Sequence, residues 1–159
     1  NINIIDLYNN ETSLYKLINN NKYNLIIASS ATWQPFRAII GILNNDIFIR
    51  FKEILNIIII YIDEAHAIDE WPIGNSAGVI NFKHKSLKDR IGYALKFKKK
   101  NKVNIPIYID NFENDFKNIY KSWPFRAIII KDEKLVYNST PVESEYNIIE
   151  IYDFLDKCD

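Results

Sequence analysis

Polar side chains suited to redox chemistry follow the first continuous apolar run of the chain. The segment 29–37 reads Ser-Ser-Ala-Thr-Trp-Gln-Pro-Phe-Arg and comes directly after the apolar residues 25–28. A reactive group in this segment would follow a strand and open a helix, where unpaired backbone N–H groups and the helix dipole lower the pKa of a thiol or selenol. Trp33 stands in that reactive place. Indole forms no thiolate and does not titrate near neutral pH, so the function depends on the residue at position 33.

Two hydroxyl groups flank position 33. Ser30 and Thr32 could donate hydrogen bonds to an anion at this position. Ordinary capping of the following helix accounts for the two residues equally well.

A second polar segment, Asp-Glu-Ala-His at 63–66, follows the apolar run 57–62. Glu64 and His66 are two residues apart, so strand alternation predicts that they share one face at the carboxyl edge of the strand, where open α/β sheets bind ligands. A carboxylate beside an imidazole can fix its tautomer and tune it for proton transfer. A lone histidine more often serves structure than catalysis, but the chain has only two histidines, and the other, His84, also lies beside a loop of the candidate site.

A permanent positive charge lies near the start of a later apolar run. Arg126 follows Trp-Pro-Phe, and its guanidinium could hold a carboxylate, a phenolate or the reactive anion. A surface ion pair is the simpler alternative. Asp63 and Asp69 are interpreted as solvated loop charges.

Strands and helices are expected to alternate around these groups. Continuous apolar runs predict a central strand at 25–28 and a parallel strand at 57–62, joined by a helix over 36–55 that is long or broken near Asn44 and Asn45. The other expected elements are a helix or turn at 2–18, a long ordered or functional loop at 67–85, a helix at 85–100 capped by Ser86 with Leu87, Ile91, Ala94 and Leu95 facing the core, strands at 105–109, 127–130 and 135–137, and helices at 114–120 and 148–155. This order predicts an α/β fold of the thioredoxin-like type, with a central mixed sheet and helices on both faces.

The composition excludes several classes of function. A chain of 159 residues with 48% hydrophobic content is expected to form one domain, residues 1–159. The formal net charge is zero, which gives no electrostatic basis for binding nucleic acid. Cys158 is the only cysteine, so an internal disulfide or Cys-x-x-Cys pair is excluded, and this tail thiol is expected to have no role. No metal or bound cofactor is expected.

The beginning of the chain bears on its location. The sequence lacks methionine, including an initiator, which indicates a fragment or processed chain whose start is missing, with residues 1–20 as an N-terminal extension. The longest apolar run, 57–62, is far shorter than the roughly 18 residues of a membrane-spanning helix. The location stays open between a membrane anchor in a missing N-terminal segment and the cytoplasm.

Taken together, these motifs resemble the iodothyronine deiodinase family, selenoproteins of thioredoxin-like, peroxiredoxin-related fold that remove iodine reductively from thyroid hormones. The family's Ser-x-Thr-selenocysteine-x-Pro-Phe signature is matched at 30–36, with Trp33 in the selenocysteine position. Its Tyr-Ile-(Asp/Glu)-Glu-Ala-His-x-x-Asp-x-Trp motif, the most specific of the set, is matched at 61–71. Its His-x-(Ser/Asn)-x-x-Asp-Arg motif is matched at 84–90, and its late arginine by Arg126.

The resemblance covers roughly residues 20–157 and implies a mechanism. Selenium at position 33 would attack the iodine, while His66 or His84 delivers a proton and the hydroxyls of Thr32 and Ser30 tune the selenolate. Glu64 would belong to the same site.

The resemblance also implies partners. Arg126 would hold a small iodinated phenol, and an external thiol would regenerate the enzyme. The assembly state is left open, with a homodimer among the options.

Two departures from the family pattern affect the expected activity. Trp33 replaces selenocysteine, and no second cysteine near the site could serve as an internal reductant. Selenocysteine is specified by UGA, which some genetic codes read as tryptophan, and a chain rich in isoleucine, asparagine, lysine and tyrosine indicates an A/T-rich genome. The hypothesis is that Trp33 marks a UGA codon, either wrongly translated or truly read as tryptophan in an inactive relative.

Two other functions stay open. A peroxiredoxin-like peroxide reductase is favoured by Ser30 three residues before position 33 and by the Arg-Ala-Ile-Ile-Ile segment that begins at Arg126. A binding module without catalysis, with the Trp33 indole packed into the former reactive pocket, is the third alternative.

The codon at position 33 is the first testable prediction. We expect UGA in the transcript, and the mass of the peptide that contains position 33 then distinguishes selenocysteine from a UGA codon truly read as tryptophan. A UGG codon, or an indole mass without the isotope pattern of selenium, removes the selenoenzyme interpretation.

Overall fold

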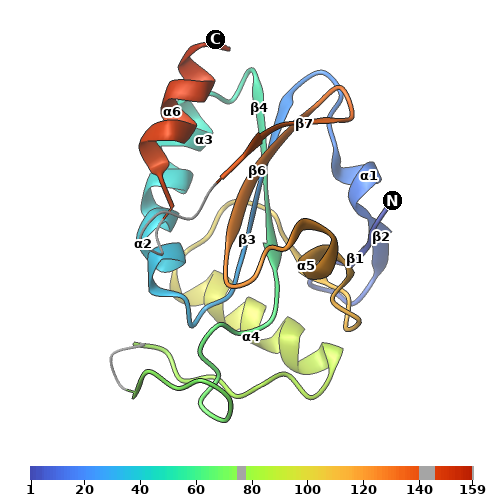
Figure 1. Cartoon of the computed structure of the whole chain (residues 1–159), viewed down its shortest axis with the longest axis vertical. Coiled ribbons are helices and arrows are strands. Elements are labelled where there is room, and N and C mark those ends of the chain that lie inside the picture. The colour runs from blue at the N-terminus through green and yellow to red at the C-terminus, as the bar shows by residue number, and fades with distance from the viewer. Residues whose placement is uncertain (75–77, 140–145, 159) are drawn as a thin grey trace.

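A mixed sheet of seven strands runs through the centre of the molecule (Figure 1). The structure is a computed structural model that describes residues 1–74, 78–139 and 146–158. The strand order is β2-β1-β5-β4-β3-β6-β7, in which β3, β4 and β5 pair in parallel and the remaining pairings are antiparallel. The strands are β1 (Asn3–Ile5), β2 (Glu11–Ser13), β3 (Tyr23–Ser29), β4 (Leu55–Tyr61), β5 (Ile107–Asp110), β6 (Arg126–Lys131) and β7 (Lys134–Asn138).

Helices cover both faces of the sheet. They are α1 (Leu14–Leu17), α2 (Gln34–Ile42), the π-helical turn η1 (Leu43–Ile47), α3 (Phe48–Arg50), α4 (Leu87–Lys100), α5 (Asp115–Tyr120) and α6 (Ile148–Asp156). Phe36 of α2, Phe97 of α4 and Leu155 of α6 join the core cluster on one face. Leu14 of α1 and Phe116 of α5 belong to the cluster on the other face (Figure 1). This arrangement agrees with the predicted fold class.

The register of the central strands determines where their loops meet. β3 and β4 run in parallel with Ser29 opposite Tyr61, so both strands end at the same edge of the sheet. Antiparallel β6 begins at that edge, because Arg126 pairs with Ala28. The loop after β3, the loop after β4 and the segment before β6 are therefore neighbours.

The N-terminal segment differs from its prediction. The helix or turn expected over 2–18 is instead a short antiparallel hairpin of β1 and β2, followed by the single turn α1. The expected helix or turn is therefore present only at Leu14–Leu17, and the prediction was wrong for the residues before it. Ile4 and Ile5 pair with β5, and both side chains are buried, so tertiary pairing determined this structure.

The predicted helix over 36–55 is a continuous helical path from α2 to α3 that ends at Arg50. The expected interruption near Asn44 is the π-helical turn η1, where the ladder of hydrogen bonds widens without breaking the path. The buried side chain of Asn44 donates to the Lys102 carbonyl and accepts from the Asn104 N–H, both at 3.1 Å. Through Asn44, the π-helical turn therefore connects the helical segment α2–α3 to the loop before β5 by two hydrogen bonds.

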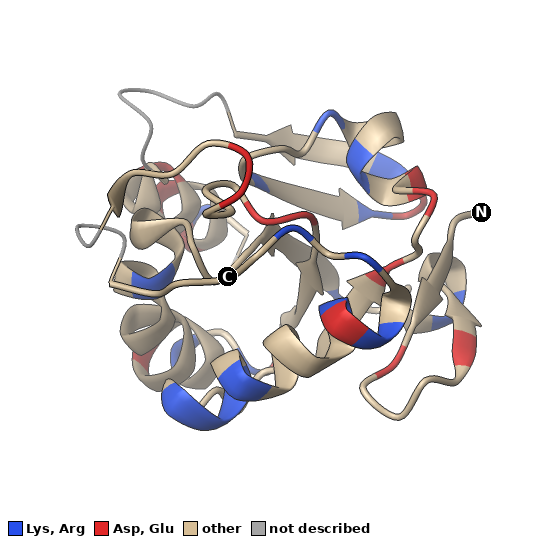
Figure 2. Cartoon of the chain, turned by 90° about the horizontal axis from the view of Figure 1, so that it is seen from below, with Lys and Arg blue, Asp and Glu red and all other residues tan. Residues whose placement is uncertain are grey.

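Helix α4 begins as predicted, because the Ser86 hydroxyl accepts the N–H of Asp89 at 3.1 Å. The lysines at its other end complement the helix dipole (Figure 2). Ile91 and Ala94 are buried as expected, but Leu95 is 44% exposed and Phe97 lies in the core instead.

The other predicted strands and helices are present, with bounds shifted by at most two residues. The loop predicted at 67–85 joins β4 to α4, and its residues 75–77 lie outside the described part. Within the described ranges, no helix has the length and apolar character needed to cross a bilayer.

Helix α5 offers a matched test of the packing. Phe116 is fully buried, whereas Ile119 on the same helix is 64% exposed. We expect Phe116→Ala to lower the free energy of unfolding by about 3–5 kcal/mol, because it leaves a cavity in the core. Ile119→Ala should change it by less than about 0.5 kcal/mol. Chemical denaturation measures both, and equal effects would contradict this placement of α5.

Candidate active site

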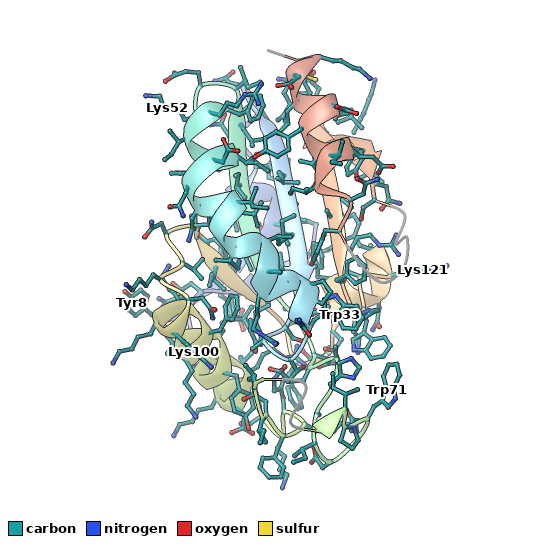
Figure 3. All side chains as sticks on the ribbon, turned by 90° about the vertical axis from the view of Figure 1, so that its left-hand side faces the viewer. Tyr8, Trp33, Lys52, Trp71, Lys100 and Lys121 are labelled. Atoms are coloured by element: carbon teal, nitrogen blue, oxygen red, sulfur yellow. The ribbon has the colours of Figure 1, made fainter. Side chains whose placement is uncertain are left out.

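Position 33 lies at the edge of the sheet where β3 ends and helix α2 begins. Trp33 is the N-cap residue of α2, and no side chain caps this helix terminus. Figure 3 shows Trp33 and Trp71 towards the same end of the molecule, with Lys52 at the opposite end. The position therefore lies at the positive end of the helix dipole, as the sequence predicted, although Pro35 brings no N–H group to the first turn.

The Trp33 indole is packed among aromatic rings. It is 9% exposed and stacks with His66 at a centroid distance of 5.4 Å and with Phe125 at 5.3 Å. Its Nε1–H is buried and has no hydrogen-bond partner among the residues that the structure describes. Such an unpaired donor is uncommon inside proteins and costs about 1–3 kcal/mol.

The carboxylate of Glu64 joins the loop after β4 to the loop after β3. Its Oε2 accepts the Thr32 hydroxyl at 2.7 Å and the Thr32 backbone N–H at 3.1 Å. Its Oε1 accepts the hydroxyl of Tyr61 and the side-chain amide of Asn81, the latter at 3.0 Å. The ring of His84 lies 3.4 Å from the same oxygen through Nε2. Glu64 is therefore a buried carboxylate whose two oxygens are both bound.

These contacts determine its ionisation. Burial raises the pKa of Glu64, but hydrogen bonds from His84, Tyr61 and Thr32 lower it by more, so the pKa lies below its ordinary value. The pKa of Tyr61 is raised well above its ordinary value by burial and then by the charge of Glu64. Glu64 is therefore anionic at neutral pH, and Tyr61 stays protonated and donates.

The two predicted hydroxyls both contact the loop after β4, and Thr32 donates its only hydroxyl hydrogen to Glu64, so it has none left for an anion at position 33. Thr32 Oγ1 donates to Glu64 and accepts the backbone N–H of His66 at 3.0 Å. Ser30 Oγ accepts the backbone N–H of Ala65 at 3.0 Å. Neither hydroxyl caps α2, so the capping alternative does not hold. Within the described part of the chain, the Ser30 hydroxyl accepts a hydrogen bond and donates none.

Both histidines belong to this region but have different partners. The His66 ring is stacked on Trp33, and its Nδ1 lies 3.1 Å from the Trp71 carbonyl. His84 contacts Glu64 through Nε2, while its Nδ1 accepts from the guanidinium of Arg90 at 3.0 Å. Glu64 and His66 thus approach position 33 from the loop after β4, and His84 approaches Glu64 from the segment before α4.

Arg126 is held by the backbone and forms no ion pair within the described residues. Its guanidinium donates to the carbonyls of Ser139 at 2.8 Å and Lys121 at 2.9 Å. Its Nε–H is buried and has no partner in the described part of the chain.

The interpretation of Asp63 as a solvated charge was wrong. Its carboxylate forms ion pairs with Arg90 and Lys117, and its side chain is only 30% exposed. Asp69 is exposed, and its carboxylate accepts the backbone N–H of Lys83 at 2.7 Å.

An open cleft of about 630 Å³ reaches the buried Glu64 and His84 from the surface. Trp71 and Trp123 line it, with ring centroids 6.1 Å apart, and are 56% and 43% exposed. The remaining lining residues are Asp63, Ala65, Glu70, Lys83, Lys117, Asn118 and Lys121. Arg126 does not line this cleft.

Sequence reasoning missed several members of the site. Tyr61 was read only as part of a strand, although a hydroxyl at the end of a buried apolar run is a usable signal. Arg90 was noted within a motif without a role. Asn81 gave no signal, because its partner Glu64 lies 17 residues away in a connection without regular periodicity.

Sequence comparison finds relatives of one family. The family profile described as Iodothyronine deiodinase matches residues 1–159. The chain is 28% identical over 154 residues to a Type I iodothyronine deiodinase from Xenopus laevis, covering 97% of this chain and 60% of that protein. It is 29% identical over 107 residues to a Thyroxine 5-deiodinase from Gallus gallus, and this match covers 67% of this chain and 41% of that protein. The chain therefore spans about half the length of the curated relatives it matches.

Solved structures confirm the predicted fold. A thioredoxin-like protein from Aeropyrum pernix superposes with a TM-score of 0.66 at 12% identity, covering 98% of this chain and 88% of that one. A secreted disulfide oxidoreductase from Mycobacterium tuberculosis gives a TM-score of 0.65 at 11% identity, covering 98% and 95%. The fold is thioredoxin-like.

The Glu64 network predicts a pH-dependent contribution to stability. At pH 7, we expect Glu64→Gln to lower the free energy of unfolding by about 3 kcal/mol, because the amide cannot accept all the buried donors. Since the folded pKa of Glu64 is lowered, its contribution is complete above the unfolded value of about 4.3 and is lost as the pH falls through the folded pKa. Denaturant titrations at several pH values should show this difference shrinking in acid.

Glu53→Gln is the matched control for this test. The Glu53 side chain is 85% exposed, so its substitution should change the free energy of unfolding by less than about 0.5 kcal/mol at any pH. An equal effect of both substitutions would contradict the network.

Proposed function

Because the chain belongs to the iodothyronine deiodinase family, we propose that it is a deiodinase-type oxidoreductase that removes iodine from small iodinated phenols. In this proposal, the nucleophile is a chalcogen at position 33, with selenocysteine as the native residue. An external thiol supplies the electrons, since Cys158 is the only cysteine of the chain.

The observation that carries the proposal is the environment of position 33. The residue there is the N-cap of α2, and the ring of His66 is stacked on its side chain at 5.4 Å. A thiolate or selenolate at a helix N-terminus is stabilised by the dipole and by unpaired N–H groups. A nearby imidazole can exchange protons at neutral pH. An indole carries no negative charge for the helix N-terminus to stabilise and exchanges no proton with the imidazole at neutral pH.

The unpaired Nε1–H of Trp33 supports the same conclusion. Proteins that bury a tryptophan usually provide an acceptor for its N–H. None is present among the described residues. A selenocysteine or cysteine side chain would bring no N–H donor into this place.

The cleft favours an aromatic substrate with negative charge. Its volume of about 630 Å³ is in the range of small-molecule sites. Trp71 and Trp123 offer exposed ring faces, and Lys121 offers positive charge, whereas Lys83 and Lys117 are paired with Glu70 and Asp63. In a phenolate or an aromatic carboxylate, the ring could stack on an indole face and the negative group could pair with a lysine.

The proposed reaction balances in two stages. The selenolate attacks the iodine, the carbon–iodine bond breaks with its electron pair moving to the ring carbon, and that carbon takes a proton. The selenium is left as a selenenyl iodide. Two thiol molecules then reduce it, releasing iodide and a proton and forming one disulfide, and the selenol is restored.

The proton for the ring carbon has two candidate sources, His66 and His84. His66 lies beside position 33 directly, and His84 connects to it through Glu64 and Thr32. Thr32 also ties Glu64 to the backbone of His66, so the three side chains keep fixed relative positions.

A binding module without catalysis is the second candidate. It is favoured by the burial of the Trp33 indole against His66 and Phe125, because a side chain that packs this well can be a stable native residue. In this case, the chain would bind an iodinated phenol in the cleft and leave it unchanged.

Replacement of position 33 tests the proposal. In a Cys158→Ser background, we expect Trp33→Cys to release iodide from an iodinated phenol with dithiothreitol as reductant, and the selenocysteine variant to be faster, because the selenol ionises more readily. The chain with Trp33 should release none. Because Cys158 is the only native cysteine, thiol alkylation then reports position 33 alone.

Trp33→Ala serves as the matched control, since it also removes the indole but supplies no nucleophile. Peroxide consumption without iodide release by the cysteine and selenocysteine variants would favour a peroxiredoxin-like reductase. Binding of the phenol without turnover in every variant would favour the binding module. Either result contradicts the deiodinase proposal.

A further inference from the structure

Arg90 of α4 is a buried cation in contact with His84. It is 1% exposed, and its Nε donates to His84 Nδ1 at 3.0 Å. Its Nη1 donates to the carbonyls of Asp110 and Asn111, at the end of β5, at 3.0 and 2.7 Å. Its Nη2 pairs with Asp63 and donates to Asn114. The guanidinium is therefore held from several directions and cannot easily turn away from His84.

This contact determines the tautomer of His84. A guanidinium has only donors and stays protonated in proteins, so His84 Nδ1 must offer its lone pair. The ring proton then lies on Nε2, which is 3.4 Å from Glu64 Oε1. His84 is a neutral donor to Glu64. Uptake of a second proton at Nδ1 would place two donors face to face.

His66 has the opposite arrangement. The Trp71 carbonyl can only accept, so the ring proton of His66 lies on Nδ1. Its Nε2 lone pair has no hydrogen-bond partner among the described residues. The ring is stacked on the side chain at position 33. His66 can therefore gain and release a proton at Nε2 while its Nδ1 bond stays intact.

We propose that Arg90 is a positioning residue that locks His84 as a fixed hydrogen-bond donor to Glu64, which leaves His66 as the histidine that transfers the proton. The role of His66 in proton transfer rests on the proposed function. The locking of His84 by Arg90 depends on the folded chain alone and not on the residue at position 33.

Nitrogen NMR of the ¹⁵N-histidine-labelled chain with its native Trp33 tests the tautomers directly. The chain has two histidines, so Trp33-containing protein gives two ring spin systems, which His66→Gln assigns. We expect His84 to be protonated at Nε2 and His66 at Nδ1. A His84 ring protonated at Nδ1, or at both nitrogens at pH 7, would overturn the lock.

Arg90→Lys tests the cause, because an ammonium cannot reproduce the planar set of guanidinium bonds. We expect the His84 nitrogen signals to move towards the average of two exchanging tautomers, while those of His66 stay in place. If the substitution unfolds the chain, the nitrogen signals of both histidines will be averaged. The tautomers measured in the unsubstituted chain then decide whether His84 is locked. Unchanged His84 signals in folded Arg90→Lys would contradict the proposal.

Arg50→Lys is the matched control. Arg50 also pairs with an acid, Asp156, but its side chain is 51% exposed, and its contacts within the described residues are with Asp156, Phe51 and Tyr152 and not with either histidine. This substitution should leave both histidine spin systems unchanged.

The proton assignment is tested in the selenocysteine or cysteine protein. We expect His66→Gln to lower kcat by about 10²–10⁴-fold, with a smaller change in KM. His84→Gln keeps an N–H donor for Glu64, so it should lower kcat by about tenfold or less, the worth of one altered hydrogen bond. A larger loss for His84→Gln than for His66→Gln would overturn the assignment. Absence of turnover in every protein would contradict the proposed function, and the NMR result would still decide the lock.

Discussion

The carboxylate of Glu64 is the constraint on which the site depends. It is 4% exposed and accepts hydrogen bonds from the loop after β3, from the end of β4 and from the connection to α4. A buried charge of this kind is tolerated only when its acceptors are filled. The three segments must therefore assemble together, and with them position 33 and both histidines take fixed places.

The sheet makes this assembly feasible. Parallel β3 and β4 end side by side, and antiparallel β6 starts beside them, so segments distant in sequence meet at one edge of the sheet. The cleft, which is lined by two tryptophans, three lysines and three acids, opens on the Glu64 side of the site, whereas the His66 ring contacts position 33. The two histidines and the tryptophans that line the cleft thus come from different segments around one carboxylate.

Most of the fold was predictable because its strongest signals are local. The apolar runs of β3 and β4 and the cap at Ser86 each identify an element without reference to its partners. The β1–β2 hairpin was not predictable in the same way, since its strands are three residues long and form because β5 offers an edge.

In the site, too, features that depend on local sequence were predictable and features that depend on distant partners were not. The apolar runs before Thr32 and before Glu64 identify neighbouring strands, so the meeting of the two loops was predictable. Strand alternation does not explain the placement of Glu64 and His66, because β4 ends at Tyr61 and both residues lie in the loop after it. The role of Arg90 was not found, because it depends on carbonyls supplied by β5 and the loop that follows it. Asp63 was misread for a related reason: its two cations lie on α4 and α5, and nothing in its local sequence indicates them.

The packing of Trp33 has one more consequence. The indole already covers the ring surfaces of His66 and Phe125 that it contacts. No second planar molecule can stack on those same surfaces while it remains there. With tryptophan in this position, the side chain of the protein itself occupies the innermost part of the site. An aromatic ligand can reach these surfaces only if a smaller side chain replaces the indole.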